Sequence, residues 1–354
     1  MKLTFITRLF PEDSFGGGEL HTYEIWKRAK KVYDVSLISG FKKDLGLLPE
    51  DTYAINQKSN NKFWNYLKFY RKTKKYLEEI KPDLIHATCY EFPSLSIKTL
   101  LCSYHLGHLL GYVGKKSLVK KLQLFFVKKR LRKFDKIIAI SKATYNDLLK
   151  LGVEEKKLKL IYPGVDFKKF KPKKIKNKKF TIVCPSRISR EKGQDILIKA
   201  FKKIPLETLK EMELIIVGFV SDKDYLNELK REAFSWPVKF ELNVKDIVSY
   251  YQKADLIVFP TLMYEGFGFS AAEALACEKP LIASDFPSIR EIVGKNGLLV
   301  KAGDFDALAS SIEILYENKI LRNSFAKKGR KSVLKKFNWE KCFKEYCKIY
   351  EELI

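Results

Sequence analysis

Residues 254–285 read ADLIVFPTLMYEGFGFSAAEALACEKPLIASD and contain two apolar runs with a glycine-rich segment between them. We expect buried strands over Leu256–Phe259 and Pro280–Ala283, with a helix between them. Glu265 would lie just before this helix and Glu273 about two turns into it. Because one helix face repeats every three to four residues, both carboxylates could point toward a single ligand.

The residues between the two glutamates favour an anion at the start of this helix. Glycines at 266 and 268 leave the backbone accessible, and the first amides of a helix lack intrahelical partners. These amides and the helix dipole together favour phosphate oxygens. The alternative is an ordinary strand–loop–helix in which Glu265 caps the helix and Glu273 is solvated.

The phrase Glu-Gly-Phe-Gly, the second Glu after seven intervening residues, and the following Lys-Pro-Leu-Ile-Ala-Ser-Asp resemble the retaining family-4 glycosyltransferases of GT-B fold. The resemblance implies nucleotide-sugar chemistry on two Rossmann-like α/β domains that face a cleft. It also implies that Glu273 holds the ribose hydroxyls and Glu265 the donor-sugar hydroxyls. The phosphate or sugar oxygens would then be bound by the amides of Gly266, Phe267, Gly268 and Phe269.

The composition suits a globular protein of two domains, with 354 residues, 46% hydrophobic and 31% charged. The formal net charge is +26, and the first 170 residues contribute +17 of it (34 basic, 17 acidic). Such a field attracts anionic partners such as phospholipid, lipid phosphate, nucleotide or nucleic acid. A Lys- and Glu-rich thermophile surface is the alternative explanation. No nucleic-acid-binding motif is present, so we expect no nucleic-acid partner.

The cysteines and apolar runs indicate the compartment. Six cysteines are scattered without a C-x-x-C pair, which predicts reduced thiols, no zinc and an intracellular site. We expect no signal peptide, because Arg8 and Pro11 interrupt the first apolar run. The longest uncharged run, Thr99–Gly114, is too short to span a bilayer. We therefore expect a cytoplasmic protein, peripheral on the inner face of the cell membrane.

The N-terminal half alternates strands with helices, which predicts a parallel doubly wound sheet. Gly16, Gly17 and Gly18 follow the first strand, where a glycine-rich turn can approach a phosphate. The resemblance matches this turn to a donor-binding Gly-Gly-x-Glu turn. It also matches His105, after the strand predicted over Leu100–Tyr104, to a histidine that approaches the donor sugar. His86 matches a D-x-x-H pattern, although Thr88 replaces the second histidine often seen there.

Two segments of this half, 62–77 and 115–136, interleave apolar and aromatic residues with six and ten basic residues. Each has helical spacing with one apolar face, the pattern of a helix lying in an anionic membrane interface. The alternative is an outer helix with a core-facing stripe and extended lysine side chains. Two such segments together favour a membrane surface and, with it, a lipid-linked acceptor.

The second domain opens with a strand over Phe180–Pro185, followed by Ser-Arg-Ile-Ser-Arg-Glu-Lys-Gly. The resemblance implies that Arg187 and Lys192 clamp the donor diphosphate. Two fixed cations can neutralise a leaving diphosphate as a metal would, so we expect no metal site and no cofactor. Asp222-Lys223-Asp224 resembles a metal-binding D-x-D, but we expect Asp222 to cap a helix, and Asp304 likewise.

These observations predict a domain at 1–165, a linker at 166–179, a second domain at 180–335 and a final helix at 336–354 that packs on the first. The predicted activity is retaining, metal-independent transfer of a hexose from a UDP- or GDP-sugar to a lipid-linked or membrane-surface acceptor. Three alternatives stay open: a soluble acceptor, a nucleotide-sugar epimerase of the same fold, and a non-catalytic basic binding protein.

Overall fold

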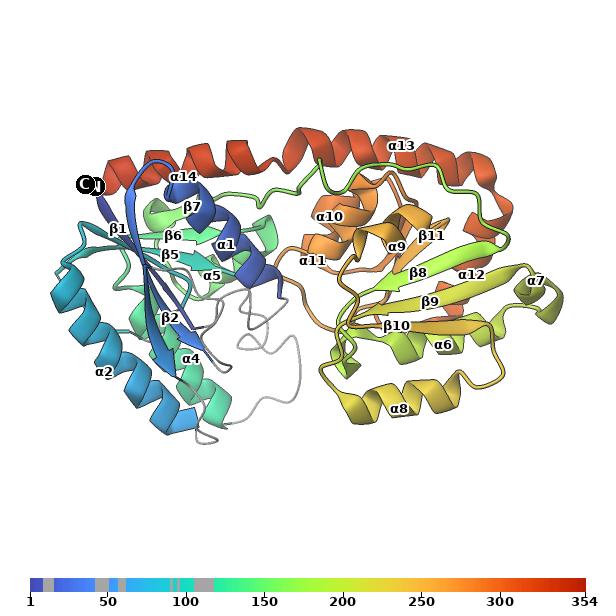
Figure 1. The fold of residues 1–354 in the computed structure, drawn as a ribbon, viewed down its shortest axis with the longest axis horizontal. Helices are drawn as coiled ribbons and strands as arrows, with labels where there is room; N and C mark the ends of the chain where they lie inside the picture. The colour runs from blue at the N-terminus through green and yellow to red at the C-terminus, as the bar shows by residue number, and fades with distance from the viewer. Residues whose placement is uncertain (9–15, 42–50, 57–61, 90–91, 94–95, 105–117) are drawn as a thin grey trace. The chain divides into compact units, whose positions relative to one another are not determined.

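The computed structural model describes residues 1–8, 16–41, 51–56, 62–89, 92–93, 96–104 and 118–354. The chain divides into two compact units (Figure 1). One consists of Met1–Pro163 together with Trp339–Ile354, and the other of Gly164–Asn338. The segment 166–179 therefore falls inside the second unit, and the last helix groups with the first.

The first unit is built on a parallel sheet whose strand order, among the described residues, is β3-β2-β1-β4-β5-β6-β7. Its strands are β1 (Lys2–Thr7), β2 (Asp34–Phe41), β3 (Thr52–Asn56), β4 (Leu84–Ala87), β5 (Lys98–Ser103), β6 (Lys136–Ala139) and β7 (Leu158–Leu160). Its helices are α1 (Gly17–Ala29), α2 (Lys62–Ile80), α4 (Leu118–Leu131), α5 (Lys142–Lys150) and α14 (Trp339–Leu353). The sequence pattern did not predict β3, an edge strand whose Thr-Tyr-Ala-Ile-Asn sequence has no continuous apolar run.

Residue alternation along β4 explains how this sheet is covered. Ile85 and Ala87 lie in the core cluster that includes Phe69 and Leu77 of α2 and Val127 of α4. The alternate residue His86 points to the other face, where it contacts α14. His86 thus lies within β4 and is fully buried.

Buried aromatic and histidine side chains hold α14 on the first unit. His86 is stacked on Phe5 and on Tyr346 of α14, with centroids 4.5 and 5.4 Å away, and its Nδ1 lies 2.7 Å from the Tyr350 hydroxyl. The second buried histidine, His21 of α1, contacts Tyr346 with ring centroids 5.8 Å apart. The Nε2 atoms of both histidines are buried without a hydrogen-bond partner. Burial lowers the pKa of each to about 3, with a contribution from His21 in the case of His86.

The two basic aromatic segments form α2 and α4, which meet where Arg130 Nη2 donates to the Tyr66 hydroxyl at 2.6 Å. Both helices turn a stripe into the core, which includes Phe69 of α2 and Leu131 of α4, so the core-facing alternative holds for these residues. Other aromatic side chains on the same helices are exposed: Trp64 by 59%, Phe125 by 62% and Phe126 by 60%. None of the helices in the described ranges combines the length and hydrophobicity that crossing a bilayer requires.

The second unit has a six-stranded parallel sheet within its fully described residues, in the order β10-β9-β8-β11-β12-β13. The strands are β8 (Phe180–Pro185), β9 (Met212–Gly218), β10 (Val238–Leu242), β11 (Leu256–Phe259), β12 (Leu281–Ser284) and β13 (Leu298–Val300). The helices are α6 (Gln194–Lys203), α7 (Leu206–Lys210), α8 (Lys223–Glu232), α9 (Val248–Lys253), α10 (Phe269–Ala276), α11 (Pro287–Val293), α12 (Phe305–Glu317) and α13 (Lys319–Lys336).

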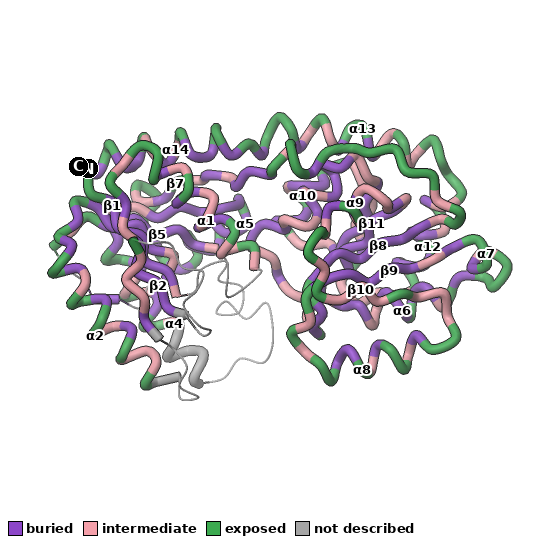
Figure 2. Tube along the Cα trace, viewed as in Figure 1, coloured by how far each residue is buried: buried purple, intermediate pink, exposed green. Residues whose placement is uncertain are grey.

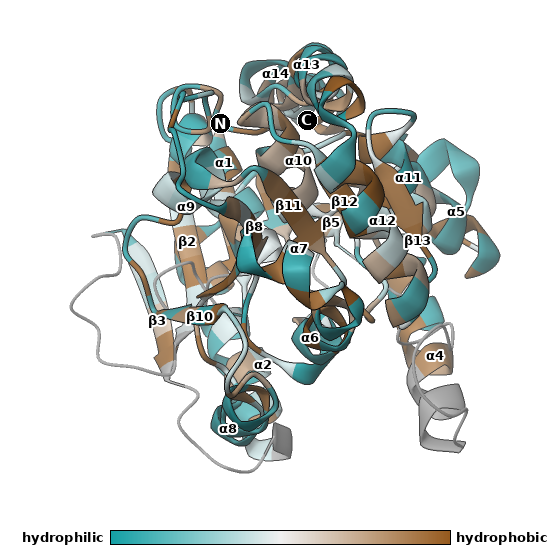
Figure 3. Cartoon of the chain, turned by 90° about the vertical axis from the view of Figure 1, so that its right-hand side faces the viewer, coloured by the Kyte–Doolittle hydropathy of each residue, from teal (hydrophilic) through white to brown (hydrophobic). Residues whose placement is uncertain are grey.

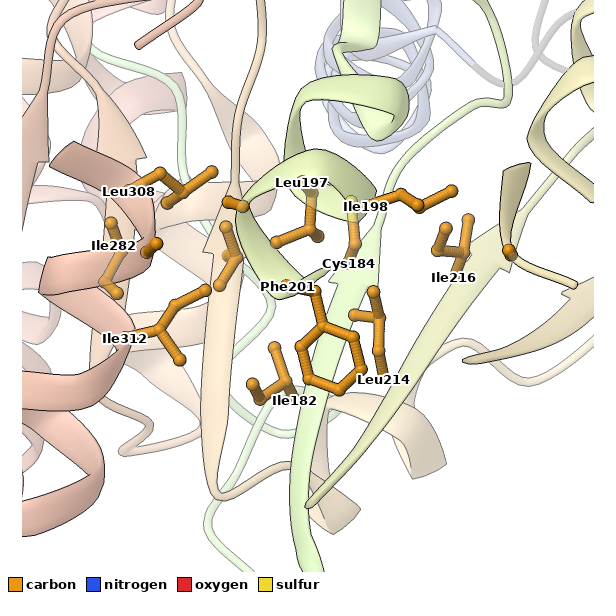
Figure 4. Close-up of a cluster of buried hydrophobic side chains, with 14 of the residues drawn as sticks. Ile182, Cys184, Leu197, Ile198, Phe201, Leu214, Ile216, Ile282, Leu308 and Ile312 are labelled. Atoms are coloured by element: carbon orange, nitrogen blue, oxygen red, sulfur yellow. The ribbon is translucent and has the colours of Figure 1, made fainter. Parts of the chain in front are cut away.

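The core of this unit lies between one sheet face and α6, α8 and α12. Side chains such as Phe201 of α6, Leu214 of β9 and Ile312 of α12 meet there (Figure 4). Figure 2 shows β8, β9 and β11 mostly buried and α8 alternating between buried and exposed residues, and Figure 3 shows the same contrast in hydropathy. The predicted caps are confirmed, because Asp222 accepts from the Tyr225 amide and Asp304 from the Ala307 amide.

Candidate functional site

The strand order of the second unit changes direction between β8 and β11, because β9 and β10 lie on one side and β12 and β13 on the other. In open parallel sheets the loops that leave such a switch point at the carboxyl ends of the strands form the ligand-binding crevice. Here those loops are 186–193 after β8 and 260–268 after β11. They contain Arg187, Lys192 and Glu265, three of the side chains singled out from the sequence.

The two loops are tied together through one carbonyl group. The Glu191 carbonyl accepts from the Leu262 amide at 2.8 Å, from the Met263 amide at 3.2 Å and from the Thr261 hydroxyl at 3.2 Å. Gly193 completes the joint, because its φ of +68° is left-handed and a Cβ there would lie 2.2 Å from the Pro260 carbonyl oxygen. Position 193 therefore requires glycine both for its conformation and for the close approach of the two loops.

Lys192 and Glu265 are joined directly within this crevice. Lys192 Nζ lies 2.5 Å from Glu265 Oε1, and the two side chains are only 11% and 15% exposed. The Thr261 hydroxyl lies 3.3 Å from the same carboxylate oxygen, and Ser288 Oγ donates to the Glu265 carbonyl at 2.6 Å. An ammonium group is therefore held in a partly desolvated position, where it interacts strongly with negative charge.

Arg187 is placed more loosely than Lys192. Its Nη2 donates to Glu191 Oε1 at 3.1 Å, and the two side chains are about equally exposed, at 42% and 43%. An exposed pair of this kind is weak, so Arg187 can exchange its carboxylate for another anion at little cost. Of these two cations, Lys192 is therefore fixed and Arg187 movable.

Glu273 occupies the second turn of α10, as its fifth residue. We expected it about two turns into the helix, and the difference arises because α10 begins only at Phe269, after Gly268 in a left-handed conformation. The Tyr251 hydroxyl donates to Glu273 Oε2 at 2.9 Å. Desolvation raises the pKa of Glu273 to about 7, against the opposing effect of this hydrogen bond.

Several residues that support the site were not found from the sequence. Tyr251 and Thr261 each contact one of the two glutamates, yet in the sequence they appear as ordinary residues of a helix and a loop. Asn243, which directly follows β10, is another residue of this kind. It adopts a φ of +53°, and its side-chain oxygen accepts from the Val220 amide at 3.1 Å, so asparagine serves this turn in place of glycine.

Gly266 and Phe267 lie in the loop after β11, and Phe269 is the first residue of α10. Gly16, Gly17 and Gly18 lie in the first unit. Gly16 is the N-cap of α1, and a Cβ on Gly18 would lie 3.0 Å from the ring of Tyr104, which follows β5. The glycine turn therefore lies at the carboxyl edge of that sheet, where a ligand is expected. His105 lies outside the described residues. Among the residues that the structure does describe, no group of three or more His, Cys, Asp or Glu side chains could hold a metal ion.

Two family models match successive parts of the chain. The Glycosyltransferase Family 4 model matches residues 15–169, and the model of Glycosyl transferases group 1 matches residues 165–332, which include Arg187, Lys192, Glu265 and Glu273. The chain belongs to the group 1 glycosyltransferases. This glycosyltransferase is 29% identical over 368 residues to the glycosyltransferase MJ1178 of Methanocaldococcus jannaschii, and the match covers 96% of this chain and 95% of that one.

Other comparisons agree on family and fold. A GDP-mannose-dependent monoacylated alpha-(1-6)-phosphatidylinositol monomannoside mannosyltransferase of Corynebacterium glutamicum is 31% identical over 198 residues, or 50% of this chain and 51% of that one. The crystal structure of HepE of Anabaena in complex with UDP and glucose superposes with a TM-score of 0.81 at 20% identity, and the match covers all of both chains. This glycosyltransferase has the GT-B fold.

Replacing Gly193 of the glycosyltransferase by alanine should damage both stability and turnover. The left-handed conformation costs about 1–2 kcal/mol for a residue with a Cβ. The contact with Pro260 must in addition push the two loops apart and displace Lys192. We expect a lower free energy of unfolding, measured in urea, and a lower kcat, and both losses should exceed those of the control variant.

Gly152→Ala is the matched control. Gly152 also has a left-handed φ, +80°, but a Cβ there would meet nothing within 4 Å. This variant should show the conformational cost alone, with turnover intact. Equal stability and equal turnover in the two variants would remove the loop joint from the site.

Proposed function

We propose that this glycosyltransferase transfers a hexose from a nucleoside diphosphate sugar with retention of configuration and without a metal ion. The observation that carries the proposal is the pair of Lys192 and Glu265 at the switch point of the second sheet. When the donor binds, its diphosphate competes with Glu265 for the Lys192 ammonium. Glu265 is then released, and its carboxylate can accept hydrogen bonds from the sugar hydroxyls.

The proposed mechanism depends on stabilising the leaving group. Cleavage of the anomeric C–O bond passes through an oxocarbenium-like state while negative charge develops on the diphosphate. Lys192 is fixed beside this charge, and Arg187 can move onto it, so the two cations interact more strongly with the transition state than with the ground state. Retention follows from a front-face displacement in which the departing phosphate accepts the proton of the acceptor hydroxyl.

A UDP- or GDP-hexose is the proposed donor. Support comes from two similar proteins, HepE of Anabaena in complex with UDP and glucose and the GDP-mannose-dependent mannosyltransferase of Corynebacterium glutamicum. Glu273 would accept hydrogen bonds from the ribose hydroxyls. Thermal-shift measurements with UDP-, GDP- and ADP-sugars test the donor directly, because a ligand at 100 times its Kd stabilises by about 2.7 kcal/mol. If none of these sugar nucleotides raised the melting temperature, the proposal would be contradicted.

Chelation of divalent metals should leave the activity intact. The two cations supply the neutralisation that a metal would otherwise provide. We expect the initial rate of sugar transfer in about 10 mM EDTA to stay within about twofold of the untreated rate, a difference of less than 1 kcal/mol. A rate that falls at least tenfold and returns with added Mg²⁺ or Mn²⁺ would disprove metal independence.

The proposed acceptor is lipid-linked or a glycan at the cytoplasmic face of the membrane. The basic charge of the first 170 residues and the exposed aromatics of α2 and α4 favour an anionic interface. The similar protein of Corynebacterium glutamicum is a phosphatidylinositol monomannoside mannosyltransferase. Turnover of the donor to a new sugar nucleotide without acceptor, followed by NMR, would instead indicate an epimerase.

Removing the two exposed phenylalanines of α4 should weaken membrane binding. Phe125→Ser with Phe126→Ser deletes apolar surface that an interface would bury, at about 1.5–3 kcal/mol for a fully buried side chain. We expect at least about tenfold weaker flotation with vesicles that contain anionic lipid at physiological salt. Phe234→Ser is the control, since Phe234 is 80% exposed in the second unit. Equal flotation of both variants would leave a soluble acceptor as the better proposal.

A further inference from the structure

A cavity of about 550 Å³ lies in the first unit, away from the edge that carries the glycine turn. It adjoins Lys98, the first residue of β5, and Asp135, which directly precedes β6. In a parallel sheet these amino ends are opposite the carboxyl ends where Gly18 meets Tyr104. The six residues of β5 separate the two edges by about 20 Å. The cavity is therefore distinct from the carboxyl edge of the sheet, which carries the glycine turn.

Its lining combines an apolar floor with a cationic rim. Phe92 and Phe134 are 8% and 5% exposed and meet edge to face, with centroids 5.9 Å apart. Around them stand three cations, Lys98, Arg130 and Lys133. Lys98 and Lys133 are exposed, whereas Phe92 and Phe134 are buried, so positive charge surrounds a polar cavity with an aromatic floor.

Among the described residues that line the cavity, cations outnumber carboxylates. Asp135 is the one carboxylate among the described residues that line the cavity. One of its oxygens accepts from the Thr99 amide at 2.7 Å, and the other lies 3.5 Å from Lys98 Nζ. Asp135 is thus engaged at the sheet edge and with one lysine. The lining favours an anion at the mouth.

A second hollow of about 510 Å³ continues the apolar surface. It is lined by Leu77, Glu78, Lys81, Pro82 and Ile97, and Ile97 also lines the first cavity. The two hollows therefore adjoin at Ile97, and the second adds the apolar side chains of Leu77 and Pro82 together with one cation and one carboxylate. A ligand that fills both needs an anionic head and an extended apolar chain.

We propose that these adjoining hollows bind a lipid phosphate, a phosphate ester on an alkyl or prenyl chain. The phosphate lies at the rim formed by Lys98, Arg130 and Lys133, and the chain passes over Ile97 toward Leu77. Since the site is a strand length from the predicted reaction edge, its ligand is not the sugar acceptor but anchors the first unit to lipid. This lipid-phosphate site is separate from the proposed function and does not depend on which sugar the donor carries.

Isothermal titration calorimetry with dodecyl phosphate below its micellar concentration tests the site on the full chain. We expect dodecyl phosphate to bind at one site. Dodecyl maltoside, which lacks the charge, should bind at least about tenfold more weakly, and so should inorganic phosphate, which lacks the chain. Inorganic phosphate that binds as tightly as dodecyl phosphate would show a site for free phosphate and overturn the proposal. Equal binding of dodecyl maltoside would overturn it as well.

Two variants and one control locate the binding. Lys133→Glu reverses a rim charge, and Ser96→Trp fills the exposed side of the cavity without a change in charge. Lys129→Glu makes the same charge change on an exposed residue of α4 outside the lining. We expect at least about tenfold weaker binding for the first two and less than twofold for the control. Equal affinities in Lys133→Glu and Lys129→Glu would show a non-specific charge effect and contradict the site.

The same variants separate this proposal from the proposed function. Lys133 and Ser96 take no part in the donor site, so thermal shifts with sugar nucleotides should equal those of the wild type. Loss of dodecyl phosphate binding with unchanged donor shifts supports the lipid site. If sugar nucleotides gave no thermal shift in the wild type or in any variant, while the wild type still bound dodecyl phosphate, the transferase proposal would be disproved and the lipid site would remain supported.

Discussion

Lys192→Ala should lower kcat by about 10²–10³, the loss that follows removal of one preorganised group facing developing negative charge. Lys192 is held in a partly desolvated crevice by Glu265 and by the loop joint at Gly193. Its charge therefore acts without reorganisation when the diphosphate departs. Steady-state kinetics with a sugar nucleotide and acceptor measure the effect, and the affinity for acceptor should change little.

Lys199→Ala provides the matched control. Lys199 also belongs to the segment after β8, but it is 45% exposed and pairs with Asp195 on the helix surface. Removing an exposed pair costs at most about 1 kcal/mol of stability and should leave kcat unchanged. Arg187→Ala should also lower kcat. Full activity of both Lys192→Ala and Arg187→Ala would remove the two cations from the mechanism.

Acidification from pH 7 to pH 5 should destabilise the first unit by about 4 kcal/mol through His21 and His86. Both histidines have a folded-state pKa of about 3, below the unfolded value of 6.5. The proton excess of the unfolded chain over the folded chain therefore rises as the pH falls, and it approaches two protons at pH 5. Stability is fully present above pH 6.5 and falls by about 1.4 kcal/mol per histidine for each pH unit below it.

Urea unfolding followed by tryptophan fluorescence measures this dependence in a Trp236→Phe background. Three of the four tryptophans, Trp26, Trp64 and Trp339, belong to the first unit, so the remaining signal reports on it. The second unit responds in the opposite sense, because the pKa of Glu273 is raised to about 7 and acidification relieves its desolvation. A signal specific to the first unit therefore avoids cancellation.

Replacing the histidines tests the cause. His86→Gln should reduce the slope of stability against pH from two protons to one, and the double variant with His21→Gln should remove it. Tyr346→Phe is the control, because it loses the contact of its hydroxyl with Cys102 but keeps both histidines buried. It should lose stability at every pH and retain the two-proton slope. An unchanged slope in the double variant would contradict the assignment.

Much of the second unit could be predicted because its local signals agree with its fold. The strands over Phe180–Pro185 and Leu256–Phe259 were predicted with the bounds that the structure has, since each is a short apolar run between polar or turn residues. The caps Asp222 and Asp304 were predicted by their chemistry. The β3 edge strand was missed because an edge strand with a mixed sequence has no apolar pattern to reveal it.

The candidate site was predicted in its residues but not in its contacts. The pattern around Glu265 and Glu273 and the loop with Arg187 and Lys192 were visible in the sequence, and their roles stay predictions. Nothing in the sequence indicated that Lys192 pairs with Glu265, since 73 residues separate them. The hydrogen bond from Tyr251 to Glu273 spans 22 residues and was equally invisible.

The sequence by itself determined the family, the two α/β halves and the identity of the side chains at the strand ends, because these depend on local pattern and on motifs of fixed spacing. Only the tertiary structure decided which of these groups meet, which aromatics of α2 and α4 face the core, and that His86 is buried beneath α14. The physical reason is that burial and ionic contacts depend on how distant segments pack, and the spacing of residues along one segment does not record its partner.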